Sequence, residues 1–274
     1  MNGGSTIVHY VNAVYRDSMT EAVKGGQVVS RVGAVLRALS GSPAHGLTTA
    51  EVAGVTRLSR PTVHRLLTSL LVEGFVDRDA GDARWHVGPE LYLLGTLAAE
   101  RYDVTELARD HVRALAALTG ESAFFSARRG DETICLIRED GSFPIRSFVL
   151  YEGVRFPLGV ASAGMAILAY LPEDEVVRYT AGDRLVERFG PRHSGASIRN
   201  RVAVTRHTGY ALNPGLILEG SWGMGATVFD AAGKPAYALS LTGVESRFRP
   251  DRQAELGSLL LQHAHQVTQR LRSA

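Results

Sequence analysis

The sequence predicts an α+β protein built from two folded parts. Residues 27–88 have the pattern of three helices followed by a short β-hairpin, whereas residues 104–274 mix short strands with helices. The chain has 274 residues, of which 45% are apolar and 21% charged, so it can bury sizeable cores. A disordered or fibrous protein is therefore excluded. We expect residues 1–26, which contain two glycine pairs, to form a flexible leader.

The composition excludes several other classes. The single cysteine, Cys135, cannot form an internal disulfide, and no apolar run reaches the ~18 residues that span a bilayer. Residues 1–20 lack the basic and apolar stretches of an export signal. A net charge of +2 is too small to indicate a polyanion-binding protein by itself. We therefore expect a soluble cytoplasmic protein that does not contact a membrane.

The three helices of the first part are marked by their ends. Apolar residues fall on one face of the first helix, at Val28, Val32, Val35, Leu36 and Leu39. Thr48 and Glu51 form a capping box that opens the second helix. Ser59 is expected to cap the third helix, and Gly74 follows its end. The connection between the second and third helices is therefore short.

A hairpin and a linker follow the third helix. Phe75 and Val76 open one strand, and Trp85–Val87 form the returning strand. The turn is expected at Asp77–Asp82, with Gly81 able to adopt a positive φ. Two helices joined by a tight turn and followed by a hairpin indicate a winged helix-turn-helix over residues 27–88. A helix that begins at Pro89 makes residues 89–103 a linker.

The remaining residues, 104–274, are expected to form one α+β domain. The helical segments are predicted at 107–118, 164–171, 173–179, 198–208 and 251–271. The strands are predicted at 123–127, 133–138, 145–150, 210–212, 225–229 and 236–241.

The third helix carries the clearest functional pattern. With its apolar stripe turned inward, polar and basic side chains point outward or to the flanks, at Arg60, Thr62, His64, Arg65 and Ser69. Arginine can bind guanine or phosphate, hydroxyls can reach bases or backbone, and the helix N-terminus at Ser59 favours a phosphate. The predicted DNA-binding surface also includes Thr48 before the second helix, and Arg78 and Arg84 in the hairpin.

Simpler interpretations compete with this surface. A basic helix face can be merely solvated, and His64 can be a packed polar residue near the turn. Residues 27–88 contain seven Arg against five Asp or Glu, an excess of +2. One such domain would bind DNA weakly, whereas a symmetric pair doubles the contacts. Dimerisation is therefore part of the hypothesis.

Several motifs resemble the IclR family of bacterial transcriptional regulators. In the first part they are Val55-Thr-Arg-Leu-Ser-Arg-Pro-Thr-Val-His-Arg-Leu-Leu67, Glu73-Gly-Phe-Val76 and Trp85-His-Val-Gly88. In the second part they are Phe156-Pro157, Ser162-Ala-Gly164, Ala166-Ile-Leu-Ala169, Leu171-Pro172, Gly209-Tyr-Ala211, and Ser240 with Thr242. The resemblance spans residues 27–272. It implies an N-terminal winged helix-turn-helix, a linker helix and a C-terminal GAF-like domain that binds a small effector and helps to assemble dimers or tetramers.

Three departures from the family pattern stand out. Arg57 lies where the family usually has Gly, and a positive φ there would cost on the order of 1 kcal/mol. Met165 replaces a common Lys, and Gly215-Leu216 replace a frequent acidic pair. Since the last two changes remove charge near the implied pocket, the effector cannot be copied from other members.

The resemblance also implies the effector-contacting residues, which are Phe148, Phe156, Ser162, Ala163, Asn213, Gly223, Ser240 and Thr242. Apolar walls with a few hydroxyl, amide and backbone donors suit a small organic acid or an aromatic metabolite. Phe148 and Phe156 can equally be ordinary core aromatics. Ser240 and Thr242 lie two apart on a strand and so share one face, which favours a ligand-directed hydroxyl pair.

The sequence gives little support for an enzyme. Ser162 is one residue out of register for a Gly-x-Ser-x-Gly elbow, and Cys135 sits in an apolar run typical of a buried strand. His263 and His265 are two apart on a helix, which suits no metal pair. Gly223-x-Gly225 leads into a strand rather than a helix, so no dinucleotide cofactor is expected.

The leading hypothesis is a ligand-responsive, sequence-specific regulator that binds a double-stranded DNA operator as a homodimer or homotetramer, with no cofactor. The alternative is an effector-sensing protein that acts mainly through protein contacts, with the winged helix as a dimerisation platform. A third possibility is an enzyme with a DNA-binding appendage.

Overall fold

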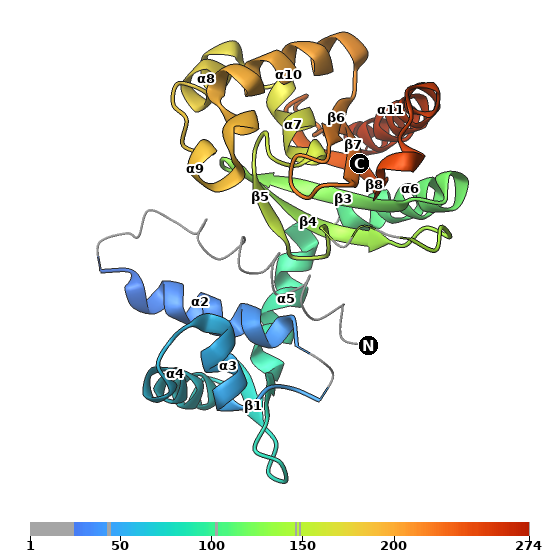
Figure 1. Ribbon diagram of the computed structural model, residues 1–274. Coiled ribbons are helices and arrows are strands. Elements are labelled where there is room, and N and C mark those ends of the chain that lie inside the picture. The colour runs from blue at the N-terminus through green and yellow to red at the C-terminus, as the bar shows by residue number, and fades with distance from the viewer. Residues whose placement is uncertain (1–24, 43–44, 102–103, 146, 148, 274) are drawn as a thin grey trace. The chain divides into compact units, whose positions relative to one another are not determined.

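The structure, a computed structural model, describes residues 25–42, 45–101, 104–145, 147 and 149–273. The chain divides into two compact units, of which one ends at Asp103 and the other begins at Val104 (Figure 1). Most of the expected leader, residues 1–24, lies outside the described residues.

The N-terminal unit contains its elements in the predicted order. They are α2 (Gln27–Ser40), α3 (Thr49–Thr56), α4 (Arg60–Val72), β1 (Val76–Arg78), β2 (Trp85–Val87) and α5 (Pro89–Arg101). Val35, Val52, Val63, Leu67 and Trp85 meet in the core of this unit. The strands β1 and β2 pair antiparallel, with Val76 opposite Val87. The winged helix-turn-helix architecture is confirmed.

The capping predictions for α3 and α4 are also confirmed. The Thr48 hydroxyl accepts from the Glu51 N–H at 3.2 Å, and the Glu51 carboxylate accepts from the Thr48 N–H at 2.7 Å. Ser59 caps α4 by accepting from the Thr62 N–H at 3.4 Å. Arg57, the C-cap of α3, has φ 55° and ψ 23°, so the position where the family usually has Gly does require a left-handed residue.

The turn of the wing differs from the prediction. The Asp79 carboxylate accepts from the N–H groups of Gly81 and Asp82 at 2.7 and 3.3 Å, and this local turn fixes the first half of the loop. The chain then reverses at Ala83, which has φ 59°, whereas Gly81 is not among the residues with positive φ. The expectation for Gly81 is therefore wrong, because the Asx turn shifts the left-handed residue by two positions.

The C-terminal unit is built on a six-stranded antiparallel sheet in the order β5-β4-β3-β8-β7-β6. The strands are β3 (Ser122–Arg129), β4 (Glu132–Glu139), β5 (Arg155–Pro157), β6 (Ala211–Pro214), β7 (Ser221–Phe229) and β8 (Pro235–Val244). The helices are α6 (Val104–Thr119), α7 (Ser162–Ala169), α8 (Glu173–Tyr179), α9 (Val186–Phe189), α10 (Gly195–Thr208) and α11 (Pro250–Ser273), with short 3₁₀ turns at Pro191–His193 and Glu245–Arg247.

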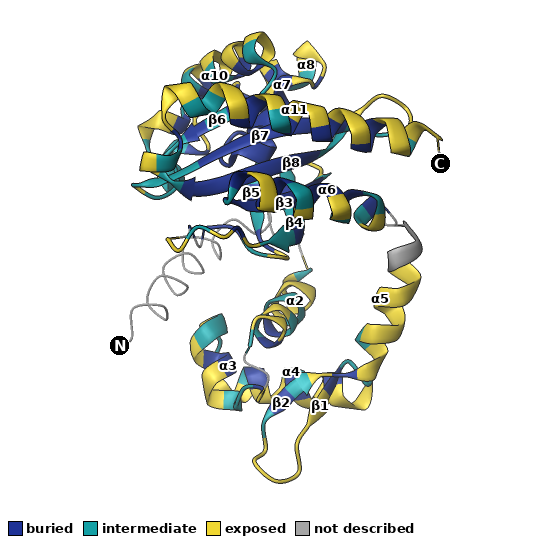
Figure 2. Ribbon diagram, turned by 90° about the vertical axis from the view of Figure 1, so that its right-hand side faces the viewer, coloured by how far each residue is buried: buried dark blue, intermediate teal, exposed yellow. Residues whose placement is uncertain are grey.

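Helices cover both faces of this sheet. Phe124 and Cys135 face one apolar core together with α7, α8 and α10, whereas Phe125 and Ile137 face a second core with α6 and α11. Figure 2 shows the strands of this unit as buried and the helices as exposed on their outer sides. The period-two alternation of the strands thus separates two cores. The α+β fold class is confirmed.

Two predictions in the C-terminal unit need correction. The strand predicted at 145–150 is absent from the described residues of that segment, and β5 forms instead at Arg155–Pro157. The backbone of Cys135 in β4 bonds to Gly153 and Val154, so the later segment occupies the β4 edge. The predicted helix 164–171 begins earlier, at Ser162, so its first turn includes residues that were expected in the preceding loop.

Cys135 is a buried residue of β4, as predicted. It is 2% exposed, and burial raises the pKa of its thiol to about 12, so it is not a thiolate nucleophile. In the described residues, no helix combines the length and the apolar character that crossing a bilayer requires.

Candidate functional site

The outward face of α4 is polar and basic. Val63, Leu67 and Leu70 are buried against the core. On the opposite face the structure places Arg60, His64, Arg65 and Ser69 in solvent, with Thr62 half-buried at the flank. The interpretation of His64 as a packed residue is wrong, because His64 is exposed, and its ring hydrogen-bonds with the Thr68 hydroxyl at 3.3 Å. The helix therefore presents an arginine-bearing surface.

Three other predicted DNA-binding residues have partners within the N-terminal unit. Thr48 is engaged in the α3 cap, which also lowers the pKa of the Glu51 carboxyl through hydrogen bonds from Thr48. Arg84 lies 3.3 Å from Glu51, donates to the Gly46 carbonyl at 3.0 Å and lies 3.5 Å from Asp82. Arg78 lies over the Trp85 ring, 5.2 Å from its centroid, while remaining exposed. Thr48 and Arg84 thus position α3 and the wing.

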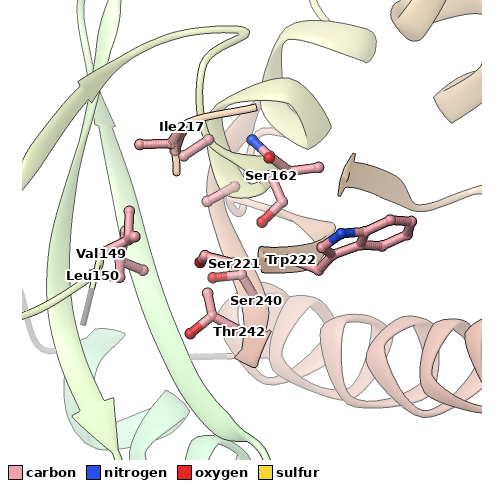
Figure 3. Close-up of a pocket in the computed structure, with 12 residues that line it drawn as sticks. Val149, Leu150, Ser162, Ile217, Ser221, Trp222, Ser240 and Thr242 are labelled. Carbon is pink, nitrogen blue, oxygen red and sulfur yellow. The ribbon is translucent and has the colours of Figure 1, made fainter. Parts of the chain in front are cut away.

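The C-terminal unit contains a pocket between α7, the strands β7 and β8, and the segment that carries Val149 and Leu150. Its lining residues are Val149, Leu150, Ala161, Ser162, Ala163, Asn213, Ile217, Ser221, Trp222, Gly223, Ser240 and Thr242. Figure 3 shows the hydroxyl-bearing residues on one side of the pocket and Val149 with Leu150 on the other. The structure brings together the predicted residues Ser162, Ala163, Asn213, Gly223, Ser240 and Thr242.

Of the two predicted phenylalanines, Phe156 does not line this pocket. Phe156 is 2% exposed and belongs to the core beneath α7, so its prediction as an effector contact is not supported by its position. Phe148 lies outside the described residues. The lining residues that were not predicted from the sequence are Val149, Leu150, Ala161, Ile217, Ser221 and Trp222. Ser221 and Trp222 precede Gly223 on β7 and could have been inferred from strand continuity.

The floor of the pocket carries hydroxyl groups without partners. Ser240 Oγ and Thr242 Oγ1 are buried and make no hydrogen bond to any described residue. Their residues are 1% and 8% exposed. A buried hydroxyl without a partner costs about 1–3 kcal/mol, so this floor is poised to bind a polar group that enters the pocket.

The N-terminus of α7 adds backbone donors to the same pocket. Ala161 is the N-cap and supplies no side-chain cap, and the first helical bond runs from the Met165 N–H to the Ala161 carbonyl. The N–H groups of the first turn therefore have no partner within the helix. Gly223 and Gly225 let β7 approach this turn, because a Cβ on either residue would crowd Ser162. The pocket thus offers donors without a formal positive charge.

Asn213 lines the pocket and also ties two of its walls together. Its amide donates to the Val160 carbonyl at 2.7 Å and accepts from the Leu216 N–H at 2.9 Å. These bonds hold the turn before α7 and the loop that contains Ile217, so Asn213 positions two walls of the pocket.

The pocket is small and uncharged. It offers about 20 Å³ for the centre of a water molecule, roughly enough for one water. Its described lining contains no Asp, Glu, Lys, Arg or His. Burial lowers the pKa of His193, whose Nδ1 bonds to the Phe189 carbonyl at 2.8 Å, to about 4, so this ring is neutral at pH 7. A bound ligand would have to be small or would have to move the Ile217 and Val149 walls.

A winged helix-turn-helix with an exposed arginine-bearing helix, in the same chain as an α+β unit with an internal pocket, defines a DNA-binding transcriptional regulator. The family model for the bacterial transcriptional regulator IclR C-terminal domain matches residues 96–269, and that for the IclR helix-turn-helix domain matches residues 28–80. The chain therefore belongs to the IclR family, whose members are transcriptional regulators rather than enzymes.

Relatives and solved structures agree with this assignment. The chain is similar to the HTH-type transcriptional regulator BhcR of Paracoccus denitrificans, with 29% identity over 81% of this chain and 80% of that protein. It is also similar to an IclR transcriptional regulator from Alicyclobacillus acidocaldarius, with 26% identity, a TM-score of 0.70, and coverage of 89% and 98%. An IclR homolog from Microbacterium hydrocarbonoxydans, complexed with 4-hydroxybenzoate, shares the fold at 19% identity, a TM-score of 0.72, and coverage of 90% and 100%.

Proposed function

We propose that this regulator binds operator DNA through the exposed face of α4 and that a small organic or aromatic acid, bound in the C-terminal pocket, controls the binding. The observation that carries the effector class is the set of buried donors around one cavity, formed by the unpartnered hydroxyls of Ser240 and Thr242 and the uncapped first turn of α7. Such donors suit a carboxylate, and the apolar walls suit a small carbon skeleton. The 4-hydroxybenzoate held by the Microbacterium homolog belongs to this class.

The domain plan is part of the proposal. Residues 27–88 would bind DNA, 89–103 would link, and 104–274 would bind the effector, with residues 1–26 as a leader. Regulation then requires that the protein has two conformational states and that the effector binds one of them more tightly. A coupling free energy of about 1–3 kcal/mol between effector and DNA binding changes operator occupancy roughly 5- to 150-fold. The protein would act in the cytoplasm, where its DNA target lies.

A second copy of the chain is needed in this scheme. The helix α5 leaves large apolar side chains in solvent within the N-terminal unit, at Tyr92, Leu93, Leu94 and Leu97. Tyr92 is 72% exposed and Leu97 68% exposed, which is unusual for a soluble helix unless a partner covers it. We propose that α5 pairs with α5 of another chain in a homodimer, from which a homotetramer can form. Pairing would place two α4 helices on successive turns of one duplex.

Replacing Arg65 with alanine tests the DNA-binding face. The loss of one guanidinium from the exposed side of α4 should weaken binding to the DNA upstream of the protein's own gene by about 1–3 kcal/mol, or roughly 5- to 150-fold. The measurement is a fluorescence-anisotropy titration at fixed salt. Arg129→Ala, which removes an exposed arginine at the end of β3, is the matched control and should bind like the unchanged protein. Equal affinities for both variants would favour the alternative in which the winged helix makes only protein contacts.

Replacing Thr242 with valine tests the pocket. Without effector, Thr242→Val should melt at the same or a higher temperature, because it removes a buried hydroxyl that has no described partner. A thermal-shift screen of small acids, 4-hydroxybenzoate included, should identify a ligand that stabilises the unchanged protein by about 2.7 kcal/mol at 100 times its Kd. That stabilisation should be reduced in Thr242→Val.

Thr227→Val provides the control for the pocket experiment. Thr227 also has a buried hydroxyl without a described partner, but it does not line the pocket. It should therefore retain the full response to the same ligand. An equal loss of response in both valine variants would contradict the assignment of the pocket.

A further inference from the structure

Among the described residues, Arg57 and Ala83 are the two non-glycine residues with positive φ. Both lie in the N-terminal unit, Arg57 between α3 and α4 and Ala83 in the loop of the wing. Glycine adopts a left-handed backbone without strain, and asparagine and aspartate tolerate it better than most residues. Any other residue with this backbone is strained. Such strain persists where something else requires the geometry, and it often marks ligand-contacting loops.

The left-handed backbone at Ala83 is explained by contacts within the N-terminal unit. The residue that follows it, Arg84, reaches back across the unit to the Gly46 carbonyl at 3.0 Å and to Glu51 at 3.3 Å. The left-handed turn therefore directs an arginine to two internal partners. One of them, Glu51, also belongs to the capping box of α3, so the strain in the wing is offset by contacts that fix the start of α3.

The left-handed backbone at Arg57 has no such explanation within the described residues. Its side chain is exposed, and it makes no hydrogen bond, ion pair or ring contact there. Glycine could end a helix in the left-handed region with less backbone strain than arginine. An arginine at this position thus adds strain without an internal partner.

We propose that Arg57 contacts a DNA phosphate from the turn between α3 and α4, an inference that rests on the proposed DNA-binding function. Arg57 lies two residues before Ser59, the N-cap of α4, and three before the exposed Arg60. In a helix-turn-helix the first helix crosses the sugar-phosphate backbone and the N-terminal residues of the second helix contact base edges, so we place the turn between them beside that backbone. The guanidinium would meet that backbone together with the partial positive charge at the start of α4.

This contact would explain why a weakly charged domain can bind DNA. Of the four arginines predicted to bind DNA, Arg60 and Arg65 are exposed, whereas Arg84 is paired internally and Arg78 lies over the Trp85 ring. Arg57 therefore supplies a charge that Arg84 does not. Since a phosphate contact carries no sequence information, Arg57 should contribute equally to binding of specific and non-specific DNA.

The experiment compares three substitutions of Arg57 in the full chain. Arg57→Gly removes both strain and charge, Arg57→Asn removes the charge but tolerates the left-handed backbone, and Arg57→Lys retains both. Each is titrated against two duplexes, the DNA upstream of the protein's own gene and a random sequence of equal length, over a series of salt concentrations.

Arg57→Gly and Arg57→Asn should bind both duplexes roughly 5- to 10-fold more weakly per protomer at 0.1 M salt, and the slope of log affinity against log salt should fall by about one. Arg57→Lys should stay within about 3-fold of the unchanged protein. The melting temperature of Arg57→Gly should rise by roughly 2–4 °C, because the strain is relieved. Weaker binding in a more stable protein is a combination that a purely structural arginine would not give.

Other outcomes would overturn the inference. Unchanged affinity of Arg57→Gly and Arg57→Asn, with Arg65→Ala still impaired, would refute the Arg57 contact and leave the DNA-binding function intact. Unchanged affinity of Arg65→Ala as well would refute both. A lower melting temperature in Arg57→Gly would mean that Arg57 serves the fold, which also contradicts the inference.

Discussion

Trp85→Ala is expected to destabilise the N-terminal unit by about 3–5 kcal/mol and to abolish DNA binding. Trp85 is 1% exposed, its indole N–H donates to the Thr49 hydroxyl at 2.9 Å, and its backbone bonds to Leu47 in both directions. A unit of this size has a stability of roughly 4–11 kcal/mol, so the loss removes a large share of it. Without the Trp85 indole, the wing loses one of its contacts with the start of α3, and the Arg84–Glu51 pair remains.

The two tryptophans of the chain make this prediction measurable, because each unit contains one of them. In Trp85→Ala, urea unfolding followed by Trp222 fluorescence reports the C-terminal unit, and far-ultraviolet circular dichroism reports both units. We expect a new early transition by circular dichroism and an unchanged transition by fluorescence. Trp85→Phe, which retains most of the buried area, should lose only about 1–2 kcal/mol. A single unshifted transition in Trp85→Ala would contradict the assigned core.

Glu121→Ala is expected to destabilise the C-terminal unit by about 3 kcal/mol. The Glu121 carboxylate is 1% exposed and accepts from Arg247 and Arg252, both at 2.7 Å. Removal of one partner from a buried ion pair costs about 3–5 kcal/mol, and the lower value applies because the Arg247 side chain is 31% exposed and keeps part of its hydration. Once the Glu121 carboxylate is removed, the one acceptor among the described residues that the Arg247 and Arg252 guanidinium groups still share is the Thr119 carbonyl.

Further variants separate the effect of losing the Glu121 ion pairs from the effect of losing the packing of its side chain. Trp222 fluorescence in a Trp85→Phe background gives the unfolding free energy of the C-terminal unit. Glu121→Gln keeps the shape and one oxygen acceptor, and should lose less than Glu121→Ala. The double variant Glu121→Ala with Arg247→Ala should recover part of the stability, because one unpaired charge is removed. A double variant that loses the full sum of both single effects would contradict the ion-pair explanation.

The N-terminal unit was predictable because its signals are local. The capping box at Thr48 and Glu51, the cap at Ser59 and the apolar stripe of α4 each depend on residues within one or two helical turns. The wing loop was predicted less well, since the Asp79 side chain decided where the chain reverses. The internal role of Arg84 was not predicted, because Arg84 pairs with Glu51, which lies far away in the sequence.

The C-terminal site depended more on tertiary structure. The strand positions of Ser240 and Thr242 placed both hydroxyls on one face, which the structure confirms, and the family resemblance supplied the positions on α7 and β7. Sequence patterns could not show that the segment at 153–157 outcompetes 145–150 for the edge of β4, nor that this change leaves Val149 and Leu150 to line the pocket. Phe156 was named from the family resemblance, and sequence patterns could not show that it belongs to the core beneath α7.

A nuclease footprint on the DNA upstream of the protein's own gene tests the central claim most directly. If two copies present their α4 helices to one duplex, the protein should protect two half-sites whose centres lie about 10 base pairs, or a multiple of that, apart on one face of the helix. Arg65→Ala should lose this protection at the same protein concentration. Protection that is uniform along the fragment, or none at concentrations where the protein is fully folded, would contradict the account.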